Sequence, residues 1–465
     1  MTFDGQSTGG TRRLVVAGVT SGVGKTTLTC AALAAFRQRG WRVQPFKSGP
    51  DYIDPGHHAL AAGRASRNLD SVLLPPATLR TLFARAAGRA DLALVEGVMG
   101  LFDGRNGRDD EGSTAELATL LDAPVVVVID VAKTSRTAGA IALGCLHFDP
   151  GLRVAGFIVN KVGSLTHARW ATEAIEAATG LPVFGAFPRD PDLALPERHL
   201  GLVPTAETAP DTAFMARLAD AAECYLDLDR LWAVAEDRAL PAPFGDLFPA
   251  ERPDRRVTIA VARDRAFNFY YEDSLDILQA WGADLTPFSP LDDDNLPPGA
   301  QGVLLGGGFP ELFAAELAAN TPMRAAVRAA ARQGLPIYGE CGGLMYLGRT
   351  LTDLEGRRHD MVGLVPYDSV MRRGRLSLGY RSAIAARSSP ILECGATVRG
   401  HEFHYSELGE PVPAATAAYR VTERDGALEG YAAGSVLASY VHVHLGSDPA
   451  MARRLVAMCS RVGAL

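Results

Sequence analysis

The sequence lacks the features that mark membrane, secreted and zinc-ribbon proteins. None of its apolar runs approaches the roughly 20 residues that cross a bilayer, and the amino-terminal residues lack the apolar core of a secretory signal. Its six cysteines are scattered without a CxxC pair, which favours a reducing compartment over a disulfide scaffold. We therefore expect a cytoplasmic protein with no membrane partner.

An excess of positive charge is also missing. The 465 residues include 46 Lys and Arg against 53 Asp and Glu, so the net charge is −7. Such a chain has no basic field to displace counterions from nucleic acids, and no nucleic-acid partner is expected. With 47% hydrophobic and 21% charged residues the chain is too apolar for bulk disorder, and its length suits two or more domains.

Short apolar strands alternate with Ala- and Leu-rich helical segments in the first half of the chain. A strand at residues 14–17 leads into a helix at residues 25–39, which Gly40 ends. Continuous apolar strands separated by helices predict a parallel sheet with helices on both faces. The further strands of this sheet are expected at residues 41–46, 92–95, 125–129, 154–159 and 183–187.

This alternation stops at a proline-rich stretch and then restarts. Residues 236–255 contain four prolines and predict a linker between an amino-terminal domain, residues 1–235, and a carboxy-terminal domain, residues 256–465. No internal repeat is visible, so two different α/β domains are expected. Strands of the second domain are predicted at residues 257–261, 302–305 and 335–338, followed by a mixed sheet in the tail from Ser377.

A glycine-rich loop, GVTSGVGKTT at residues 18–27, joins the first strand to its helix. Gly22 and Gly24 let backbone N–H groups crowd around phosphate oxygens, Lys25 reaches the β- and γ-phosphates, and Thr26 can hold Mg²⁺. The pattern predicts an ATP site formed by Ser21, Gly22, Val23, Gly24, Lys25, Thr26 and Thr27.

The spacing of this loop resembles that of the SIMIBI branch of P-loop proteins, which includes dethiobiotin synthetase and the partitioning ATPases. Five residues, where the strict motif has four, separate Gly18 from Gly24. The partitioning ATPases carry a second lysine early in the loop, where this chain has Thr20. That difference favours a metabolic ligase over a dimeric regulatory switch. Glu96, after the strand at residues 92–95, can complete a metal site.

Residues 47–58, KSGPDYIDPGHH, combine charged and aromatic side chains with glycine and proline after the second strand. Lys47 can neutralise a phosphoryl group in transfer, and Asp51 and Asp54 can coordinate Mg²⁺ or position an acceptor. Composition alone fits a polar turn equally well.

The second domain carries a Gly-x-Cys-x-Gly turn around Cys341, between a predicted strand and a helix. Small flanking residues permit the strained elbow of a nucleophile, and the helix start lowers the pKa of the thiol. Buried inert thiols are expected instead at Cys30 and Cys145, in Ala- and Leu-rich helices. Upstream, a strand ends in three glycines, of which Gly307 and Gly308 are predicted to stabilise an oxyanion.

A nucleophilic cysteine needs a histidine base. His442 and His444 lie two residues apart on a predicted strand and share a face, so spacing does not choose between them. His401 and His404 form no HExxH zinc motif, since their spacing is one residue short, and we interpret them as structural or substrate-facing.

This half resembles the class I glutamine amidotransferases, and alignment of residues 440–442 with their base motif favours His442. Many of those enzymes carry a Glu two residues after the base. His444 stands at that position here, so the usual Cys-His-Glu triad is not complete there, a departure that is common in the corrin-amidating branch.

The order of the motifs resembles the cobyrinic and hydrogenobyrinic acid a,c-diamide synthases over nearly the whole chain. The matching segments are KSGPDYIDPGHH at 47–58, VEGVMGLFDG at 95–104 and LPERHLGL at 195–202. The resemblance implies that ATP and glutamine, with Mg²⁺ as cofactor, amidate the a and c acetate side chains of a corrin ring. Because ammonia is lost when it is protonated in water, a shielded route for it between the domains is predicted.

The same resemblance assigns Asp51, Asp54 and Glu96 to the acceptor and metal site, and together with the motifs above it gives a set of expected roles. Lys47, Asp51, Tyr52 and Asp54 would serve the acceptor and phosphoryl transfer, and Thr26, Asp51 and Glu96 would hold the metal. Asn160 and Lys161 fall where related folds contact the nucleotide base.

Two alternatives and several questions stay open. The same chemistry could act on nickel-sirohydrochlorin, or the chain could be a regulatory P-loop switch, against which Thr20 and the Cys341 elbow both count. A homodimer is expected. The sequence does not say whether the corrin carries cobalt or which acetate reacts first.

Overall fold

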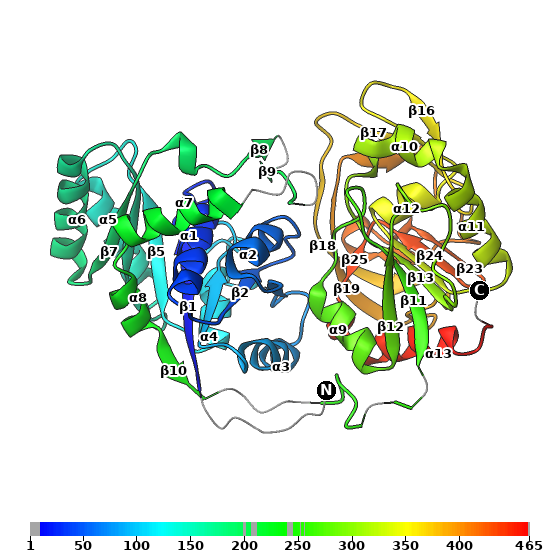
Figure 1. The fold of residues 1–465 in the computed structure, drawn as a ribbon, viewed down its shortest axis with the longest axis horizontal. Coiled ribbons are helices and arrows are strands. Elements are labelled where there is room, and N and C mark those ends of the chain that lie inside the picture. Colours follow the sequence, from blue (N-terminus) through cyan, green and yellow to red (C-terminus); the bar gives the residue numbers. More distant parts are fainter. Residues whose placement is uncertain are drawn as a thin grey trace. The chain divides into compact units, whose positions relative to one another are not determined.

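The computed structural model describes residues 10–198, 201–205, 212–239, 245–251, 253–254 and 256–463. The chain divides into two compact units, residues 1–244 and 245–465 (Figure 1). Both units contain a largely parallel sheet with helices, so the predicted two-domain α/β fold is confirmed. In the part of the chain that is described, no helix combines the length and the apolarity needed to span a bilayer.

The sheet of the first unit has β1 (Thr11–Gly18) at its centre, and its strand order is β3-β2-β4-β1-β5-β6-β7. All these neighbours pair in parallel. The other strands are β2 (Val43–Ser48), β3 (Arg67–Leu69), β4 (Leu92–Glu96), β5 (Val125–Asp130), β6 (Val154–Val162) and β7 (Val183–Pro188), with the short pair β8 (Glu197–Arg198) and β9 (Gly201–Leu202) apart from them.

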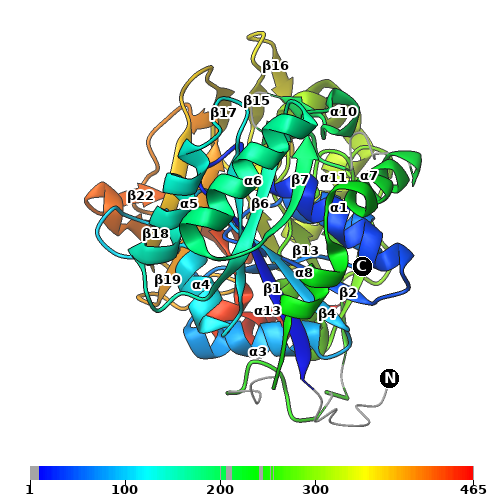
Figure 2. The same ribbon diagram turned by 90° about the vertical axis from the view of Figure 1, so that its left-hand side faces the viewer.

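Successive residues of a strand point to opposite faces of the sheet, and nearly all residues of β4 and β5 are buried. Both faces of this sheet are therefore covered, and helices cover them. One hydrophobic core contains residues of β1, α1 and α7. The helices α5 and α6 lie side by side (Figure 2). The helices are α1 (Lys25–Gln38), α2 (Asp54–Ala62), α3 (Pro76–Ala87), α4 (Thr114–Leu120), α5 (Thr137–Phe148), α6 (Leu165–Thr179), α7 (Thr212–Tyr225) and α8 (Leu228–Val234).

The first residues of the predicted linker form a strand. β10 (Glu236–Arg238) pairs antiparallel with Thr11–Arg13 at the start of β1. The buried Arg13 fixes this pairing, since its guanidinium donates to the carbonyl of Arg238 at 2.6 Å and to that of Leu121 at 2.9 Å. Residues 236–238 therefore belong to the first sheet, which proline content alone does not reveal.

The second unit has its own central sheet, with the order β12-β11-β13-β14-β24-β23. Its strands β11 (Val257–Ala262), β12 (Ala283–Phe288), β13 (Gly302–Leu305), β14 (Ile337–Glu340) and β24 (Val436–Ser439) are parallel, and β23 (Tyr431–Ala433) is antiparallel. Its helices are α9 (Glu272–Ala280), α10 (Ala314–Ala319), α11 (Thr321–Arg332), α12 (Gly342–Leu347) and α13 (Pro449–Cys459).

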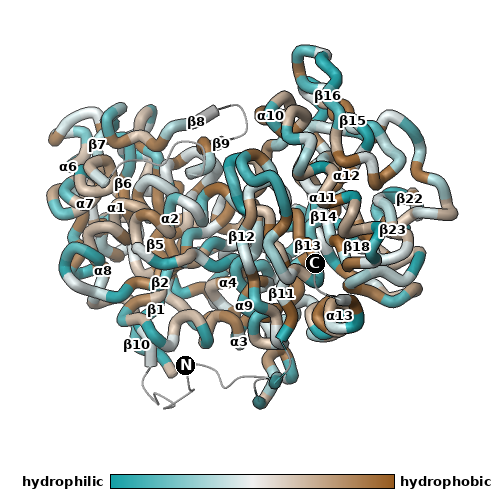
Figure 3. Tube along the Cα trace, turned by 45° about the vertical axis from the view of Figure 1, so that its right-hand side comes forward, coloured by the Kyte–Doolittle hydropathy of each residue, from teal (hydrophilic) through white to brown (hydrophobic). Residues whose placement is uncertain are grey.

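Two smaller sheets complete this unit, with the orders β16-β15-β17-β20 and β22-β21-β18-β19-β25. Polar residues gather in loops at the margin of the unit, such as the hairpin at β16, which is teal at its tip in Figure 3. The strands are β15 (Thr350–Thr352), β16 (Arg358–Asp360), β17 (Asp368–Met371), β18 (Ser377–Ala385), β19 (Thr397–His404), β20 (Ser406–Leu408), β21 (Tyr419–Val421), β22 (Ala427–Glu429) and β25 (His442–Val443).

Two glycines of α5 provide a test of how this helix packs. A Cβ on Gly139 would lie 2.5 Å from the carbonyl oxygen of Ala174 in α6, whereas a Cβ on Gly144 would meet nothing within 4 Å. Gly139→Ala is expected to lower the free energy of unfolding by about 1–3 kcal/mol, because helix backbone cannot yield easily. Gly144→Ala is expected to raise it by up to about 1 kcal/mol, since alanine favours the helix. Chemical denaturation measures both, and equal shifts would contradict this packing.

Candidate active sites

The glycine-rich loop between β1 and α1 lines a cavity of about 880 Å³ in the first unit, through Ser21, Gly22, Gly24, Lys25, Thr26 and Thr27. Val23 is instead buried in the core, and its carbonyl accepts a hydrogen bond from Asn160 Nδ2 at 2.7 Å. Gly24 has a φ of 91°, and a Cβ there would lie 2.2 Å from the same Nδ2 atom. The loop therefore needs glycine at this position both for its conformation and for its contact with β6.

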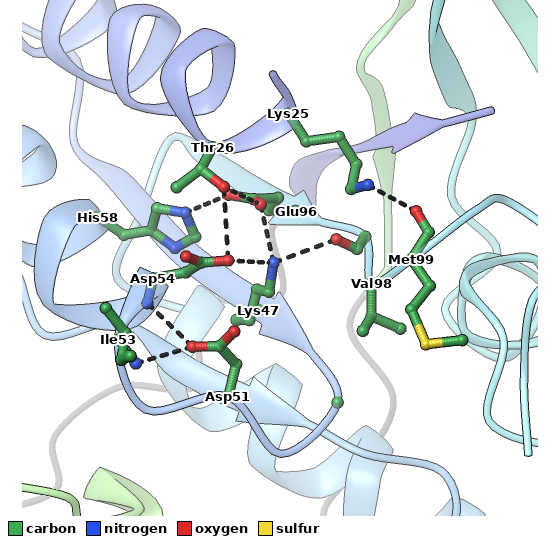
Figure 4. Close-up of polar contacts among 12 residues, drawn as sticks. Lys25, Thr26, Lys47, Asp51, Ile53, Asp54, His58, Glu96, Val98 and Met99 are labelled. Atoms are coloured by element: carbon green, nitrogen blue, oxygen red, sulfur yellow. Dashed lines mark hydrogen bonds and ion pairs between the residues drawn. The ribbon is translucent and has the colours of Figure 1, made fainter. Parts of the chain in front are cut away.

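Lys25 points into the loop and is held by neutral partners. Its Nζ donates to the carbonyl oxygen of Met99 at 2.5 Å (Figure 4) and to that of Thr20 at 3.1 Å. Burial, and then the charge of Lys47, lower the pKa of Lys25 to about 8. Its hydrogen-bond partners are uncharged carbonyls that do not neutralise the ammonium, so the group suits an anionic ligand.

Lys47 and Glu96 form the centre of a buried charge cluster. β2 and β4 place the two residues opposite each other in register, and Lys47 Nζ lies 2.8 Å from Glu96 Oε1 and 2.5 Å from Asp54 Oδ2 (Figure 4). The second oxygen of Glu96 lies 2.5 Å from His58 Nε2, and Thr26 Oγ1 donates to Oε1 at 2.8 Å. The phosphate loop, β2, β4 and α2 thus meet at one carboxylate.

Charge within the cluster overcomes the effect of burial. Burial alone would raise the pKa of Glu96, but Lys47 and His58 hold it well below its ordinary value. Burial alone would likewise lower the pKa of Lys47, but the carboxylates of Asp54, Glu96 and Asp51 raise it above its ordinary value. Lys47 and Glu96 therefore remain charged at neutral pH.

Asp51 and Tyr52 lie in the loop that leads into α2. Asp51 Oδ1 accepts hydrogen bonds from the backbone N–H groups of Ile53 at 2.7 Å and Asp54 at 2.9 Å. Burial, and then the charge of Asp54, raise the pKa of Asp51 to about 6. Asp51 lines the cavity together with Lys47 and Asp54, while Tyr52 is half-buried beside them.

The oxygen atoms around Thr26 are of the kind that Mg²⁺ prefers. Thr26 Oγ1 lies 2.8 Å from Glu96 Oε1 and 3.4 Å from Asp54 Oδ2, so Asp54 approaches Thr26 and Glu96 while Asp51 turns one oxygen to its own loop. Among the described residues, no three His, Cys, Asp or Glu side chains are grouped to hold a metal by themselves. The donors fit an ion that takes few protein ligands and completes its shell with phosphate and water.

The far side of the cavity is formed by strand ends. Asn160 and Lys161 line it at β6, and Lys161 Nζ lies 2.8 Å from Asp130 Oδ2 at the end of β5. Sequence reasoning did not single out Asp130 or residues 187–191, at the end of β7 and just after it, which also line the cavity. Their position at the carboxyl ends of neighbouring parallel strands is the signal that would have found them.

The segment 195–202 contributes Leu195 and Leu202 to the same cavity. Residues 199 and 200 lie outside the described residues. His57 Nε2 lies 3.0 Å from the carbonyl oxygen of Val203, which ties α2 to the residue that follows the segment.

Cys341 stands at a strained elbow between β14 and α12, with a φ of 49° and a ψ of −98°. The glycines around it allow the elbow to approach its neighbours, since a Cβ on Gly343 would lie 2.3 Å from the carbonyl oxygen of Leu305. Backbone strain of this kind persists only where the surroundings hold it, and it is concentrated at functional sites. Cys30 is fully buried in α1, and Cys145 is partly buried in α5.

His442 lies beside Cys341 and against the glycine turn after β13. A Cβ on Gly307 would lie 2.6 Å from His442 Cε1. The Nδ1 atom of His442 lies 3.6 Å from Glu340 Oε2. Burial alone would lower the pKa of His442, but its hydrogen bond and charge interaction with Cys341, and then those with Glu340, raise it to about 10. The ring therefore carries a proton readily beside the thiol.

The structure separates the two histidines that spacing left equal. The strand β25 ends at Val443, and His444 Nδ1 accepts a hydrogen bond from the N–H of Gly446 at 3.0 Å. Its ring packs against Tyr271 at 4.9 Å between centroids, and burial lowers its pKa to about 3. The strand predicted to carry both histidines ends before His444, whose side chain instead caps the turn at Leu445–Ser447.

The glycine turn and β19 border the same elbow. Gly343 N–H donates to the carbonyl of Gly306 at 3.1 Å, and the N–H nitrogen of Gly308 lies 3.2 Å from where a Cβ on Gly342 would be. His401 pairs in register with His442, and His404 stacks on Tyr440 at 3.9 Å.

Two family models match this chain. The CobQ/CobB/MinD/ParA nucleotide binding domain matches residues 14–203, which contain the phosphate loop and the Lys47 cluster. The CobB/CobQ-like glutamine amidotransferase domain matches residues 258–450, which contain Cys341 and His442.

Curated relatives match over almost the whole chain. Cobyrinate a,c-diamide synthase from Synechococcus sp. is 44% identical over 97% of this chain and 99% of its own length. The proteins of the same name are also 44% identical in Dehalococcoides mccartyi, over 96% and 97%, and in Salmonella typhimurium, over 96% and 98%. The similarity thus includes both units.

Removal of the Lys47 ammonium leaves carboxylates without their partner, whereas removal of the Lys25 ammonium leaves carbonyl oxygens without theirs. Lys47→Met should lower the free energy of unfolding by about 3 kcal/mol or more, because it leaves buried carboxylates without their cation. Lys25→Met should cost no more than about 1 kcal/mol, because its partners are neutral carbonyls. Urea denaturation at neutral pH, without added ligand, compares the two variants directly.

The pH dependence of this difference has a defined sign. In the wild type the pKa of Glu96 is depressed, so its stabilising contribution is present above its unfolded pKa and is lost as the pH falls. In Lys47→Met the uncompensated carboxylates are relieved by protonation. The deficit of Lys47→Met should therefore shrink as the pH falls toward about 4, and a deficit that grew would contradict the charge cluster.

Proposed function

We propose that this chain, which belongs to the cobyrinate a,c-diamide synthase family, catalyses the ATP- and glutamine-dependent amidation of the a and c acetate carboxylates of a corrin ring in cobalamin biosynthesis. The observation that carries the proposal is the presence in one chain of a phosphate loop beside a carboxylate cluster and of a strained Cys341 beside His442. The first arrangement suits the activation of an acid, and the second suits the release of ammonia.

In the second unit, Cys341 and His442 are proposed to hydrolyse glutamine. The thiol proton passes to His442, and the sulfur attacks the amide carbon to form a tetrahedral intermediate. His442 returns the proton to the leaving nitrogen, ammonia departs, and water hydrolyses the thioester to glutamate. Gly307 and Gly308, which border the elbow, are proposed to offer backbone N–H groups to the oxyanion.

In the first unit, the loop from Ser21 to Thr27 is proposed to bind ATP, with Lys25 on the phosphates and Asn160 and Lys161 toward the base. A free carboxylate is a poor acyl donor. Attack of a substrate carboxylate oxygen on the γ-phosphorus releases ADP and gives an acyl phosphate, from which ammonia displaces phosphate to form the amide.

The Lys47 cluster is proposed to serve this transfer. Lys47 neutralises charge near the phosphoryl group, and Asp51, Tyr52 and Asp54 shape the acceptor side of the cavity. Thr26 and Glu96, with Asp51 or the closer Asp54, are proposed to hold Mg²⁺. The ion, when bound, neutralises charge on the phosphates.

Further properties complete the proposal. Ammonia loses its nucleophilicity when protonated, so a route shielded from water between the units is proposed.

The scattered, unpaired cysteines support a cytoplasmic location. A homodimer is also proposed, and light scattering by the purified chain measures its mass.

The direct test is product formation followed by mass spectrometry. The purified chain is incubated with ATP, Mg²⁺ and glutamine, and with hydrogenobyrinic acid, cobyrinic acid or nickel-sirohydrochlorin in separate reactions. The proposal expects a diamide from at least one corrin acid and ADP in step with amide formation. Amidation of nickel-sirohydrochlorin alone, or ATP hydrolysis without any amide, would contradict it.

Cys341→Ala separates the two half-reactions. Glutamine-supported amidation should fall to background, because no other group forms the thioester. Amidation supported by ammonium salts should stay within about threefold of the wild type, since ammonia then bypasses the second unit. Cys394→Ala, at an exposed thiol of the same unit, is the matched control and should retain both activities. Retention of glutamine-supported activity in Cys341→Ala would rule out its role as nucleophile.

A further inference from the structure

Glu340, the residue immediately before Cys341, directs its carboxylate at the ring of His442. Oε2 lies 3.6 Å from His442 Nδ1. The other oxygen, Oε1, accepts a hydrogen bond from the backbone N–H of Val443 at 3.0 Å and one from the Tyr338 hydroxyl. One oxygen thus fastens the side chain to the strand that carries His442, and the other faces the imidazole.

The sheet brings these groups together. Glu340 ends β14 and pairs in register with Ser439 of the parallel strand β24, three residues before His442. Tyr338 and Glu340 are two residues apart on β14 and so point to the same side. Glu340 and His442 are 8% and 1% exposed, so their interaction is screened little by water.

The other buried glutamates of this region have different partners. Glu402 is paired with Arg381 at 3.1 Å and also contacts Arg424. Glu429 accepts hydrogen bonds from the Ser439 hydroxyl and the N–H of Tyr440, both at 2.7 Å. None of these contacts of Glu402 and Glu429 involves the ring of His442.

We propose that Glu340 is the positioning residue of His442, a role that rests on the proposed glutaminase reaction. Glu340 holds the tautomer in which Nδ1 carries a proton directed at Oε2, so that Nε2 exchanges the reactive proton. The thiol proton moves from Cys341 Sγ to Nε2, Glu340 stabilises the imidazolium, and the same proton then passes from Nε2 to the leaving nitrogen. Glu340 itself neither gives nor takes a proton in these steps.

Many class I glutamine amidotransferases carry a Glu two residues after the base histidine. In this chain the carboxylate of Glu340, from another strand, takes the role of that Glu. His444 stands at that position, caps the turn at Gly446 and packs on Tyr271. Glu340, at the end of the strand that precedes the nucleophile, approaches His442 at Nδ1. The carboxylate and the nucleophile are therefore adjacent in sequence, with the histidine as the distant partner.

The titratable groups that interact with His442 in the described part of the chain include Cys341, Glu340 and His401. Cys341 and Glu340 lie at the end of β14, and His401 pairs with it from β19. Burial, and then the proximity of His442 and Arg381, lower the pKa of His401 to about 3, so His401 is neutral. Apart from the thiolate of Cys341, the negative charge that stabilises an imidazolium at His442 is therefore the carboxylate of Glu340.

The test compares three variants in glutaminase and ammonium-supported assays. Glu340→Gln keeps the shape and removes the charge, Glu340→Asp keeps the charge on a shorter side chain, and Glu429→Gln is the matched control at a buried glutamate of the same unit. Glu340→Gln should lower the glutaminase kcat roughly 10- to 100-fold with KM within about twofold. Glu340→Asp should recover part of that loss, and Glu429→Gln should stay within about threefold of the wild type.

The pH profile separates charge from structure. A raised imidazolium pKa means that His442 loses its proton only at high pH, and the neutral amide of Glu340→Gln removes part of that stabilisation. The alkaline limb of glutaminase kcat should therefore move to lower pH by roughly 1 unit in Glu340→Gln and not in Glu429→Gln. Ammonium-supported amidation should be unchanged in all variants.

Three outcomes would overturn the role of Glu340. They are a wild-type glutaminase rate and profile in Glu340→Gln, a recovery in Glu340→Asp no better than in Glu340→Gln, and an equal loss of glutamine- and ammonium-supported activity. The last outcome would make Glu340 a structural residue only. Failure of the proposed function itself appears separately, as a wild-type chain that neither hydrolyses glutamine nor forms an amide.

Discussion

A carboxylate buried at the end of a parallel strand must have a cation or several donors beside it, and both sites are built around this constraint. Glu96 ends β4 in the first unit and meets Lys47 and His58. Glu340 ends β14 in the second and meets His442 and the N–H of Val443. Removing such a carboxylate from water costs several kcal/mol unless its partners are close, so each carboxylate fixes the strands that carry those partners.

The second constraint is the close approach of backbone to side chains at these strand ends. A Cβ on Gly24 would lie 2.2 Å from Asn160 Nδ2, and a Cβ on Gly307 would lie 2.6 Å from the ring of His442. A Cβ on Gly343 would meet the backbone of β13 at 2.3 Å. At all three positions glycine lets a loop lie closer to its neighbour than a residue with a side chain could, against an amide at Gly24, the His442 ring at Gly307 and a backbone carbonyl at Gly343. These three glycines are therefore required by the geometry of the two sites.

Local patterns explain what could be predicted from the sequence. The phosphate loop, the strand that precedes Glu96 and the elbow at Cys341 each depend on a few consecutive residues, and the two α/β domains follow from the alternation of strands and helices. Contacts between distant residues could not be read in this way. The strand at 236–238 depends on its pairing with Thr11–Arg13, and the separation of His442 from His444 depends on a turn that starts at His444.

Glu340 illustrates the same limit within a recognised motif. It stands next to Cys341 in the sequence, where it reads as part of the elbow. Its relation to His442 arises only when β14 and β24 pair in parallel and the chain continues into β25. Similarly, Asp54 approaches Thr26 because α2 begins there, while Asp51 turns one oxygen to the amides that start the helix. Side-chain direction, which spacing does not encode, decides both cases.

The two buried carboxylates differ in the partner that balances them, and this difference matches the chemistry proposed for each unit. Lys47 has a raised pKa and keeps its charge at every pH near neutrality, so Glu96 belongs to a fixed electrostatic frame. Phosphoryl transfer needs such a frame, since its charges must be met without reorganisation. His442 can gain and lose a proton, so the balance at Glu340 changes during a reaction. Amide hydrolysis needs that change, because one proton must leave the thiol and then reach the departing nitrogen.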